Sequence, residues 1–585
     1  MLQTNIVQAS AKRVSMQKIL GNAGAPGLAH GNIVILRKGQ TSSQDRPALL
    51  SLAEARKKCV KQSEHLYQRA FKDIGKTEAK IFRVYTMLLK DNYLFAPMKA
   101  RIAKGESAEN AIRQECEKAA SKFTAMKQEY MRQRADDIRN VGNMVIDTMN
   151  GVSFAINLPK ENGKIILVAF KLTPADTMLL EKNRIGGFIT EQGGATSHSV
   201  ILARTMNVPA VTGVKNVLTV FRDGEDAILD GTSGTVILNP DKATCRNFLT
   251  RQRTQKHLQK IVDAFRADHA VTLDGVSMKL CANIGNPADM KLLEGKSYDG
   301  VGLFRTEFLY SSFSSCPTVE QQANAYRQVF EMTGDREVIV RTADIGGDKA
   351  IPYLKLPKED NPFLGNRGLR LWLERRKLFS EQLQAILTAS TGRSISIMLP
   401  MVTERFELCE AKDELRKAAD ILKKNGMPCC KSVKLGIMVE TPSAAIMAES
   451  FSSACDFMSI GTNDLTQYMT AADRGNPAVQ KLYNPYNPAV VRTLANIAKA
   501  GQKTGTEVCV CGELAGDLSF LPILVGFGIR KFSAAPSRLK QMRFYLCHLK
   551  LSDAKKLAEK VLTLENSTEI IKCARKFYGK RLESF

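Results

Sequence analysis

The sequence predicts a multidomain fold, in which an α/β domain with an inserted helical bundle is followed by a C-terminal (β/α)8 barrel. The bundle is predicted because residues 50–149 carry long helical patterns with few glycines or prolines, between two strand-rich stretches. The barrel is predicted because strand-like runs alternate with helical patterns through residues 271–585. A doubly wound parallel sheet is the alternative for this last part.

Strands of the α/β domain are expected on both sides of the bundle. A glycine-rich turn enters a strand within residues 21–36. After the bundle, short apolar runs between turn residues predict strands at 164–169, 187–190, 208–211, 227–230 and 235–238. We therefore assign residues 1–48 and 151–240 to the α/β domain.

The helical bundle is assigned to residues 49–150. One apolar stripe with helical spacing is formed by Ile81, Val84, Tyr85, Leu88 and Leu89. The turn at residues 105–107 ends in a serine, Ser107, which is expected to cap the next helix. A charged, helix-forming stretch at 241–270 is expected to link this half of the chain to the barrel at 271–585.

The barrel is expected to contain eight strands. They are predicted at 276–284, 300–304, 337–340, 395–399, 434–439, 457–460, 507–510 and 523–532. Helical patterns lie between most of them, at 320–333, 378–389, 404–424 and 489–503. This regular order is typical of the (β/α)8 architecture.

The composition is that of a folded globular protein, with 44% hydrophobic and 24% charged residues among 585. No apolar run approaches the roughly 18–20 residues that span a bilayer, and the N-terminus lacks a signal-peptide pattern. Thirteen cysteines are scattered, and the closest groupings, Cys429–Cys430 and Cys509–Cys511, lack zinc-site spacing. We therefore expect a protein of the reducing cytoplasm without membrane insertion.

The chain is strongly basic. Its 84 Lys and Arg against 59 Asp and Glu give a formal net charge of +25. The basic residues are dispersed, without a long basic run or a basic repeat interleaved with aromatic residues. Such a charge is compatible with nucleic acid, an anionic membrane surface or anionic substrates, and the dispersed pattern makes us expect no nucleic-acid function.

The segment Gly193–Arg204 is the first candidate for chemistry. Two glycines follow a predicted strand, and an apolar run with helical character follows them, so free backbone N–H groups are expected there. Three hydroxyl residues, Thr196, Ser197 and Ser199, surround His198, one of only six histidines. His198 is a candidate phosphoryl acceptor; the alternative is a surface histidine beside a glycine turn.

Polar residues follow five predicted barrel strands. They are Arg305–Glu307, Arg341–Asp344, Glu440–Pro442, Gly461–Asp464 and Cys511–Glu513. Active sites of (β/α)8 barrels are built at the carboxyl ends of the strands. Five successive polar strand ends therefore predict an active site at this end of the barrel.

The residue types at these ends suit phosphoryl transfer. Glu440 and Asp464 offer the hard oxygen ligands that Mg²⁺ prefers. Three arginines, Arg305, Arg341 and Arg474, offer forks for a phosphate and a carboxylate, and Asn463 can hydrogen-bond the same ligand. Cys511 is either a packing residue or a general acid. For each arginine taken alone, an ion pair at the barrel rim is the favoured alternative, and it is the combination with the carboxylates that indicates a site.

Motifs along nearly the whole chain resemble enzyme I of the bacterial phosphoenolpyruvate-dependent sugar phosphotransferase system. They are Gly27–Gly31, Arg134–Gly142, Gly193–Arg204, Phe304–Tyr310, Arg341–Lys349, Asn361–Arg367, Gly436–Pro442, Gly461–Tyr468 and Cys511–Asp517. Several also occur in pyruvate phosphate dikinase and phosphoenolpyruvate synthase. The helical insert and the lack of an ATP-binding domain are typical of enzyme I.

The resemblance implies a role for each matching residue. His198 would take the phosphoryl group from phosphoenolpyruvate and pass it to a histidine of the small carrier HPr, and Cys511 would protonate the enolate to give pyruvate. Mg²⁺ would bind Glu440 and Asp464. The residues that would hold phosphoenolpyruvate are Arg305, Arg341, Arg367, Asn463, Asp464 and Arg474.

The resemblance also implies a role for each domain. The α/β domain would be a swivelling phosphohistidine domain, the insert would dock HPr, and the barrel would bind phosphoenolpyruvate and form a homodimer. The alternatives are a dikinase-like phosphotransferase and a regulatory paralogue that senses phosphoenolpyruvate. The chain departs from the family pattern at Ala195, at Phe170–Lys171 and at Asn366.

Overall fold

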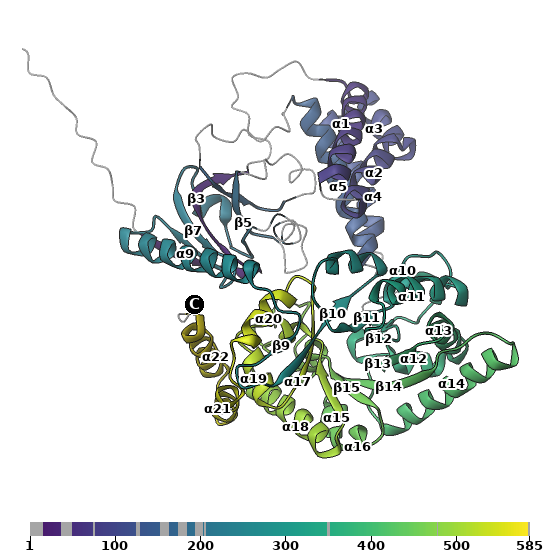
Figure 1. The fold of residues 1–585 in the computed structure, drawn as a ribbon. Helices are drawn as coiled ribbons and strands as arrows, with labels where there is room; N and C mark the ends of the chain where they lie inside the picture. Colours follow the sequence, from purple (N-terminus) through teal and green to yellow (C-terminus); the bar gives the residue numbers. More distant parts are fainter. Residues whose placement is uncertain are drawn as a thin grey trace, which may run out of the picture. The chain divides into compact units, whose positions relative to one another are not determined.

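The computed structural model describes residues 16–36, 50–73, 76–124, 129–151, 163–172, 184–192, 200, 203, 206, 208–347, 351–476 and 478–582 (Figure 1). The chain forms two compact units, Met1–Gln255 and Lys256–Phe585. The division falls inside one helix, α9 (Lys242–Ala264). Each unit is described by itself.

The helical part of the first unit contains five long helices. They are α1 (Leu52–Asp73), α2 (Lys76–Lys90), α3 (Asn92–Ala103), α4 (Ala108–Thr124) and α5 (Glu129–Met149). The predicted stripe on α2 faces the core, with Tyr85 and Leu89 buried and Phe82 buried beside them. The prediction that Ser107 caps α4 is confirmed, because its hydroxyl accepts a hydrogen bond from the Asn110 N–H at 3.3 Å.

The α/β part of the first unit is built on one mixed sheet. Its strands are β1 (Gln17–Leu20), β2 (Asn22–Ala25), β3 (Leu28–Ile35), β4 (Ile165–Ala169), β5 (Ile185–Thr190), β6 (Ala210–Thr212), β7 (Asp226–Asp230) and β8 (Thr235–Leu238), in the order β1-β8-β7-β3-β4-β5-β6-β2. Strands β3 to β6 are parallel, and the others pair antiparallel. Alternate residues face two separate cores, as in β4, where Ile166 and Val168 belong to one and Ile165 and Leu167 to the other.

The second unit contains a closed barrel. In the described part of the chain, eight parallel strands form the ring: β10 (Ser277–Ile284), β11 (Gly300–Arg305), β12 (Glu337–Arg341), β13 (Ser394–Leu399), β14 (Ser432–Val439), β15 (Phe457–Ile460), β16 (Glu507–Val510) and β17 (Lys531–Ala534). The first and last strands pair in parallel, which closes the ring. The prediction of a (β/α)8 barrel is therefore confirmed, and the doubly wound sheet is wrong. A short strand, β9 (Ala270–Val271), adds antiparallel to β10.

Helices surround this ring (Figure 1). The longer ones are α11 (Val319–Thr333), α13 (Arg376–Ala389), α14 (Arg405–Lys424), α18 (Pro488–Thr504), α20 (Leu539–Cys547), α21 (Leu551–Leu562) and α22 (Ser567–Leu582). Shorter ones are α10 (Glu307–Ser311), α12 (Leu369–Glu374), α15 (Pro442–Ile446), α16 (Ala448–Ser452), α17 (Thr462–Met469) and α19 (Leu521–Gly526). One large core joins their inner faces to the outside of the barrel.

The predicted strand at 523–532 is wrong over most of its length. The structure has helix α19 there, which ends at Gly526, and strand β17 starts only at Lys531. Residues 521–525 are all buried, so this part of the run lacks the alternation of buried and exposed residues that separates a strand from a helix. Pro522 stands in the first turn of α19, a position that proline favours, and Gly528 with φ 94° turns the chain toward β17.

Part of the barrel interior is apolar. Six residues, Leu303, Ile339, Met398, Met438, Phe457 and Cys511, form a small core inside the ring. Asn283, near the end of β10, links this strand to the ends of β16 and β17. Its side-chain amide donates hydrogen bonds to the carbonyl oxygens of Cys511 at 2.9 Å and Ser533 at 3.2 Å. The strand ends that carry the predicted site are thus fixed on a filled barrel.

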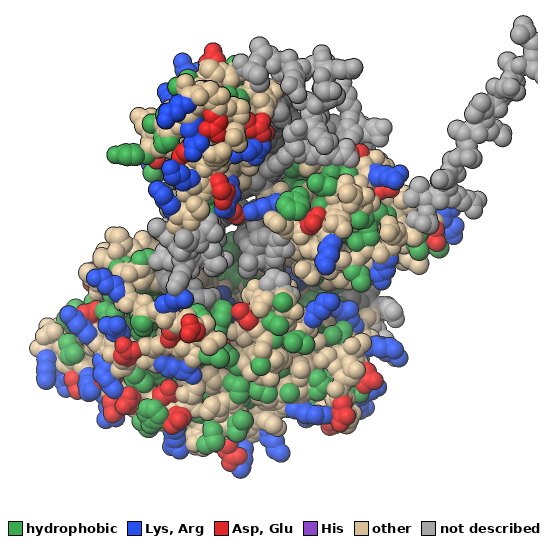
Figure 2. Space-filling view, turned by 180° about the vertical axis from the view of Figure 1, so that it is seen from behind, with side chains coloured by type: hydrophobic (Ala, Val, Ile, Leu, Met, Phe, Trp, Pro, Cys, Tyr) green, Lys and Arg blue, Asp and Glu red, His purple; other side chains and the backbone are tan. Residues whose placement is uncertain are grey.

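The charges are spread over the surface. Figure 2 shows Lys and Arg side chains distributed over that face, with Asp, Glu and hydrophobic side chains between them. None of the helices that the structure describes has an apolar stretch of the length and hydropathy needed to cross a bilayer. The excess of 25 positive charges is therefore not gathered into one patch on the face seen in Figure 2.

Candidate functional site

The predicted polar residues stand at the carboxyl ends of neighbouring strands. Arg305 and Arg341 are the last residues of β11 and β12 and lie opposite each other in the sheet register. Glu440 follows β14 directly, and Asp464 lies in the first turn of α17, just after the adjacent strand β15. Because all these strands are parallel, their polar ends meet at one end of the barrel.

Arg367 lies at the centre of a buried charge network. Its Nε and Nη2 donate to the two carboxylate oxygens of Asp344, at 3.1 and 2.5 Å. Its Nη1 donates to Asp464 at 3.4 Å and to the Tyr468 hydroxyl at 3.2 Å. Arg367 and Asp344 have side chains only 2% exposed. The network therefore holds Asp464 in place with a fixed, desolvated charge.

Arg341 is the second buried arginine. It pairs with Glu307 and lies 3.9 Å from Asp344. Burial alone would lower the pKa of Arg341, but the charges of Glu307, Asp344, Glu440 and Asp464 outweigh it and raise that pKa. The guanidinium is therefore permanently charged, and its buried Nε has no hydrogen-bond partner in the structure.

Glu440 is fully buried, and only one of its two carboxylate oxygens has a hydrogen-bond partner. Its Oε1 accepts a hydrogen bond from the Met401 backbone N–H at 2.8 Å, whereas its Oε2 has no hydrogen-bond partner. Burial, followed by the negative charges of Asp464 and Asp344, raises the pKa of Glu440 to about 8. A Cβ at Gly461 would lie 2.8 Å from Oε2, so glycine keeps the space beside this oxygen open.

These observations test whether a divalent cation fits. A buried carboxylate oxygen without a hydrogen-bond partner is costly, and a bound cation would remove that cost. Glu440 and Asp464 are close enough for their charges to interact, and both offer oxygen ligands. The residues present therefore fit a metal ion between the ends of β14 and β15.

The remaining polar residues of the predicted site are more accessible. Arg305 is exposed at the end of β11. Arg474 is 34% exposed, with its Nη1 3.6 Å from Asp464 Oδ2. Asn463 accepts a hydrogen bond from the Glu513 N–H at 3.1 Å, which links the ends of β15 and β16. Of these three side chains, Arg474 contacts the buried network through Asp464, and Arg305 is exposed to solvent.

Cys511 follows β16 and faces the barrel interior. It is 1% exposed, and its Sγ lies 3.6 Å from the carbonyl oxygen of Ile460. Burial raises the pKa of the Cys511 thiol to about 11. The thiol is therefore protonated at neutral pH, which is the state that a proton donor needs.

His198 and the rest of Gly193–Ser199 lie outside the described residues. The strand predicted before them is present as β5, which ends at Thr190. Lys171, where the chain departs from the family pattern, forms an ion pair at 2.8 Å with Asp136 of α5.

Some site residues were not predicted as such. The sequence places Asp344 and Glu307 at polar strand ends but assigns them no role. In the structure, Asp344 forms an ion pair with Arg367 and Glu307 forms one with Arg341. Each of these carboxylates follows a strand-end arginine by two or three residues, and this spacing in the sequence can indicate that a carboxylate pairs with a site arginine. The Met401 N–H, held at φ 59°, left no signal, because any residue type supplies a backbone donor.

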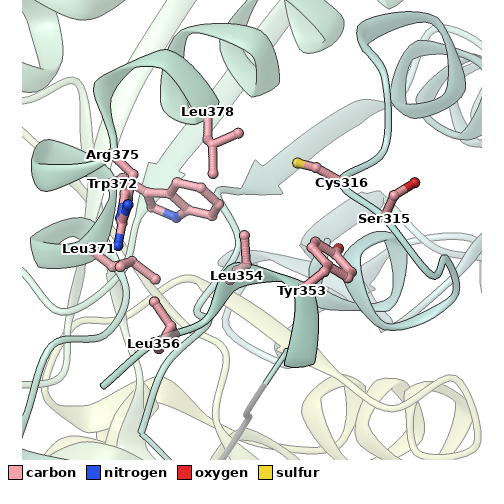
Figure 3. A pocket seen from close by; sticks show the side chains of 9 residues that line it. All are labelled: Ser315, Cys316, Tyr353, Leu354, Leu356, Leu371, Trp372, Arg375 and Leu378. Atoms are coloured by element: carbon pink, nitrogen blue, oxygen red, sulfur yellow. The ribbon is translucent and has the colours of Figure 1, made fainter. Parts of the chain in front are cut away.

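A separate cavity of about 400 Å³ lies elsewhere in the second unit (Figure 3). Its lining is Ser315, Cys316, Tyr353, Leu354, Leu356, Leu371, Trp372, Arg375 and Leu378. The lining contains no carboxylate and none of the predicted site residues. The polar strand ends, rather than this apolar cavity, therefore carry the chemistry of the candidate site.

Comparison with known families matches most of the chain to three family models. They describe the N-terminal part of PEP-utilising enzymes at residues 20–134, their mobile domain at 161–234 and their PEP-binding domain at 259–551. The PEP-binding match contains the barrel and all its strand-end residues. The mobile-domain match contains the segment around His198.

Full-length relatives agree with this. The chain is 38% identical over 569 residues to the phosphoenolpyruvate-protein phosphotransferase of Geobacillus stearothermophilus, covering 96% of this chain and 98% of the relative. It is 37% identical to that of Bacillus subtilis (strain 168), over 95% and 99% of the two chains, and 39% identical to that of Bacillus sp. (strain S), over 89% and 90%. The chain is therefore a member of the phosphoenolpyruvate-protein phosphotransferase family of PEP-utilising enzymes.

Proposed function

We propose that the protein transfers the phosphoryl group of phosphoenolpyruvate to His198 and from there to a histidine of the carrier HPr, releasing pyruvate. The observation that carries this is the group of buried Arg341, Arg367, Glu440 and Asp464 at the carboxyl end of the barrel. Two fixed positive charges beside two carboxylates suit a phosphate ester with its own carboxylate and a metal ion.

Mg²⁺ is the metal we propose, held by Glu440 and Asp464. Both ligands are carboxylates, without the sulfur or nitrogen that zinc favours. When bound, Mg²⁺ would neutralise negative charge on the phosphate and enolate oxygens. The unpartnered Oε2 of Glu440 supports this assignment.

The chain's own residues position the substrate and move one proton. Arg341, Arg305 and Arg474 would bind its phosphate and carboxylate oxygens, with Asn463 as a hydrogen-bond donor. A nitrogen of His198 would attack phosphorus as the bond to the enol oxygen breaks, which leaves enolpyruvate. The Cys511 thiol would then donate its proton to the terminal carbon, giving pyruvate. The thiolate would recover a proton from solvent before the next turnover.

Each domain has a proposed role. Residues 1–48 and 151–240 carry His198, residues 49–150 dock HPr, and residues 271–585 bind phosphoenolpyruvate and form a homodimer, with 241–270 as the link. We place the protein in the cytoplasm, which is supported by thirteen cysteines that are all free thiols.

Labelled phosphoenolpyruvate tests the proposal. The full chain, with Mg²⁺, should acquire an acid-labile, base-stable phosphate that HPr removes. His198→Ala should acquire none, whereas His257→Ala, a change at an exposed histidine of α9, should behave as the wild type. Phosphate on the His198→Ala protein would refute the acceptor assignment. Binding of phosphoenolpyruvate without any label on the wild type would identify a sensor instead of a transferase.

A further inference from the structure

Three metal-ligating side chains converge in the first unit, away from the barrel site. They are His30 of β3, Asp226 of β7 and Cys245 of α9. One ligand atom from each, an imidazole nitrogen, a carboxylate oxygen and a sulfur, lies within 4.8 Å of the other two. Ligand atoms around a tetrahedral zinc ion lie roughly 3.5 Å apart, so small side-chain rotations would complete such a set.

The fold places these three residues together. His30 pairs with Ile228, and Asn32 pairs with Asp226, so His30 and Asp226 are diagonal neighbours on one face of the sheet. Helix α9 lies along that face (Figure 1). The ring of Phe248, one turn after Cys245, packs edge-on against His30 at 5.7 Å.

A second contact fixes α9 in the same position. Arg251, a further turn along the helix, forms an ion pair with Asp230 of β7 at 3.2 Å. Cys245, Phe248 and Arg251 thus share the helix face that lies over β3 and β7. The position of the thiol near His30 is therefore supported by packing on the same face.

The His30 imidazole faces the Asp226 carboxylate. Its Nε2 lies 2.8 Å from Asp226 Oδ1, in a geometry that brings the two atoms together without forming a hydrogen bond. A neutral imidazole with its lone pair on Nε2 is the form that binds a metal. A cation between Nε2 and Oδ1 would satisfy both atoms.

The Cys245 Sγ lies 3.8 Å from the carbonyl oxygen of Pro240 and near two carboxylates. Burial, followed by the charges of Asp226 and Asp241, raises the pKa of Cys245. Asp241 is already occupied as the cap of α9, since its Oδ1 accepts a hydrogen bond from the Thr244 N–H at 2.7 Å. Asp241 is not one of the three converging side chains.

We propose that His30, Asp226 and Cys245 bind one Zn²⁺ ion, with water as the fourth ligand. Thiolate, imidazole and carboxylate together favour zinc, whereas Mg²⁺ takes oxygen ligands only. Binding forms the sulfur–zinc bond and releases the thiol proton to solvent. His30 and Asp226 have side chains 33% and 44% exposed, so the ion can enter from solvent. The bound ion would join the sheet to the first turn of α9.

Cobalt substitution of the full-length protein tests the proposal. Co²⁺ added with excess Mg²⁺, which occupies the carboxylate site, should give one equivalent of thiolate-to-cobalt charge-transfer absorption, and Zn²⁺ should abolish it. Cys245→Ser should lose this absorption, whereas Cys409→Ser, a change at an exposed cysteine of α14, should keep it. Absorption that is absent from the wild type, or unchanged in Cys245→Ser, would overturn the proposal.

Alkylation of Cys245 measures zinc binding at this thiol without replacing the cysteine. Zn²⁺ should protect Cys245 of the wild type from iodoacetamide, as seen by mass spectrometry of its peptide, and leave Cys409 reactive. His30→Gln and Asp226→Asn should each reduce the protection at least tenfold, whereas His257→Gln should not. Equal alkylation of Cys245 with and without Zn²⁺ would show that the three side chains do not form a zinc site.

Discussion

Arg367 donates one hydrogen bond to each carboxylate oxygen of Asp344, at 3.1 and 2.5 Å, and both side chains are almost completely buried. The guanidinium of Arg367 thus binds the Asp344 carboxylate through two hydrogen bonds at once, and a lysine could not form this two-bond arrangement. The charges of Asp344 and Asp464, which Arg367 also reaches, outweigh burial and raise the pKa of Arg367. Arg367 therefore serves the fold as well as the site.

Loss of this pair should destabilise the barrel. We expect Arg367→Met to lower the free energy of unfolding by about 3–5 kcal/mol, because Asp344 would stay buried without its partner. The single tryptophan, Trp372, lies in this unit, so its fluorescence during urea unfolding reports on the barrel. Arg375→Met removes a 46% exposed side chain 3.8 Å from Glu374 and should cost less than about 1 kcal/mol. Equal losses in the two variants would contradict this account.

Removal of one proposed metal ligand should separate metal binding from folding. Glu440→Gln keeps the size and the Oε1 acceptor of the side chain, so the fold should persist. We expect phosphorylation by phosphoenolpyruvate to fall by more than about 100-fold and the Mg²⁺-dependent rise in melting temperature to disappear. Glu404→Gln, at the cap of α14, is a control for the loss of a carboxylate near the barrel. A full Mg²⁺ response in Glu440→Gln would exclude Glu440 as a ligand.

The proton donor can be tested by its position in the reaction. Because the Cys511 thiol would act after the phosphoryl group has left, Cys511→Ser should slow pyruvate formation by about 100-fold or more. Phosphorylation of the enzyme in a single turnover should slow much less. The two products are measured in one quenched-flow series. If pyruvate forms at the wild-type rate, Cys511 is a packing residue of the barrel interior.

Asp274 gives a prediction about acid stability. Its carboxylate accepts hydrogen bonds from the Leu551 N–H at 2.9 Å, the Thr272 hydroxyl at 2.7 Å and the Ser552 N–H at 3.2 Å. These bonds, the one from Leu551 first, lower the pKa of Asp274 to about 2. Since the folded-state pKa is lowered, the stabilisation is present above about pH 4 and is lost as the pH falls toward 2.

The matching experiment compares melting temperatures across this range. Asp274→Asn should melt below the wild type at pH 5, and the difference should shrink as the pH is lowered to 3. Asp420→Asn, at an exposed residue of α14, should show no such convergence. A difference that stays constant between pH 5 and pH 3 would show that the charged carboxylate is not responsible.

The fold was largely predictable because local patterns and global topology agree. Parallel strands separated by helices allow few arrangements, and polar residues after them meet at one end. Arg341, Glu440 and Asp464 could therefore be assigned to one site from their positions alone. The exception at α19 arose because five consecutive residues, 521–525, are all buried, and such a short apolar run shows neither a helix nor a strand period.

Contacts between distant segments could not be predicted in the same way. Lys531 is buried at the opposite end of the barrel, where its Nζ donates to Glu337 and Glu507 at 2.6 Å each. The residues His30 and Cys245 come from segments far apart in sequence, so spacing rules for zinc sites do not apply to them. Such groupings depend on sheet register and helix placement, which single-sequence patterns do not specify.

The pairing of β10 with β17 has a consequence for biosynthesis. Lys279–Ala282 can bond to their partners only after Lys531–Ala534 have left the ribosome, because the ring closes between the first and last strands. All strands of the first sheet, by contrast, are complete at Leu238. The nascent chain therefore emerges with a complete first sheet, while the edge of β10 that pairs with β17 stays unpaired until the last barrel strand emerges. During that interval we expect the unfinished barrel, rather than the sheet of the first unit, to be the part that chaperones shield.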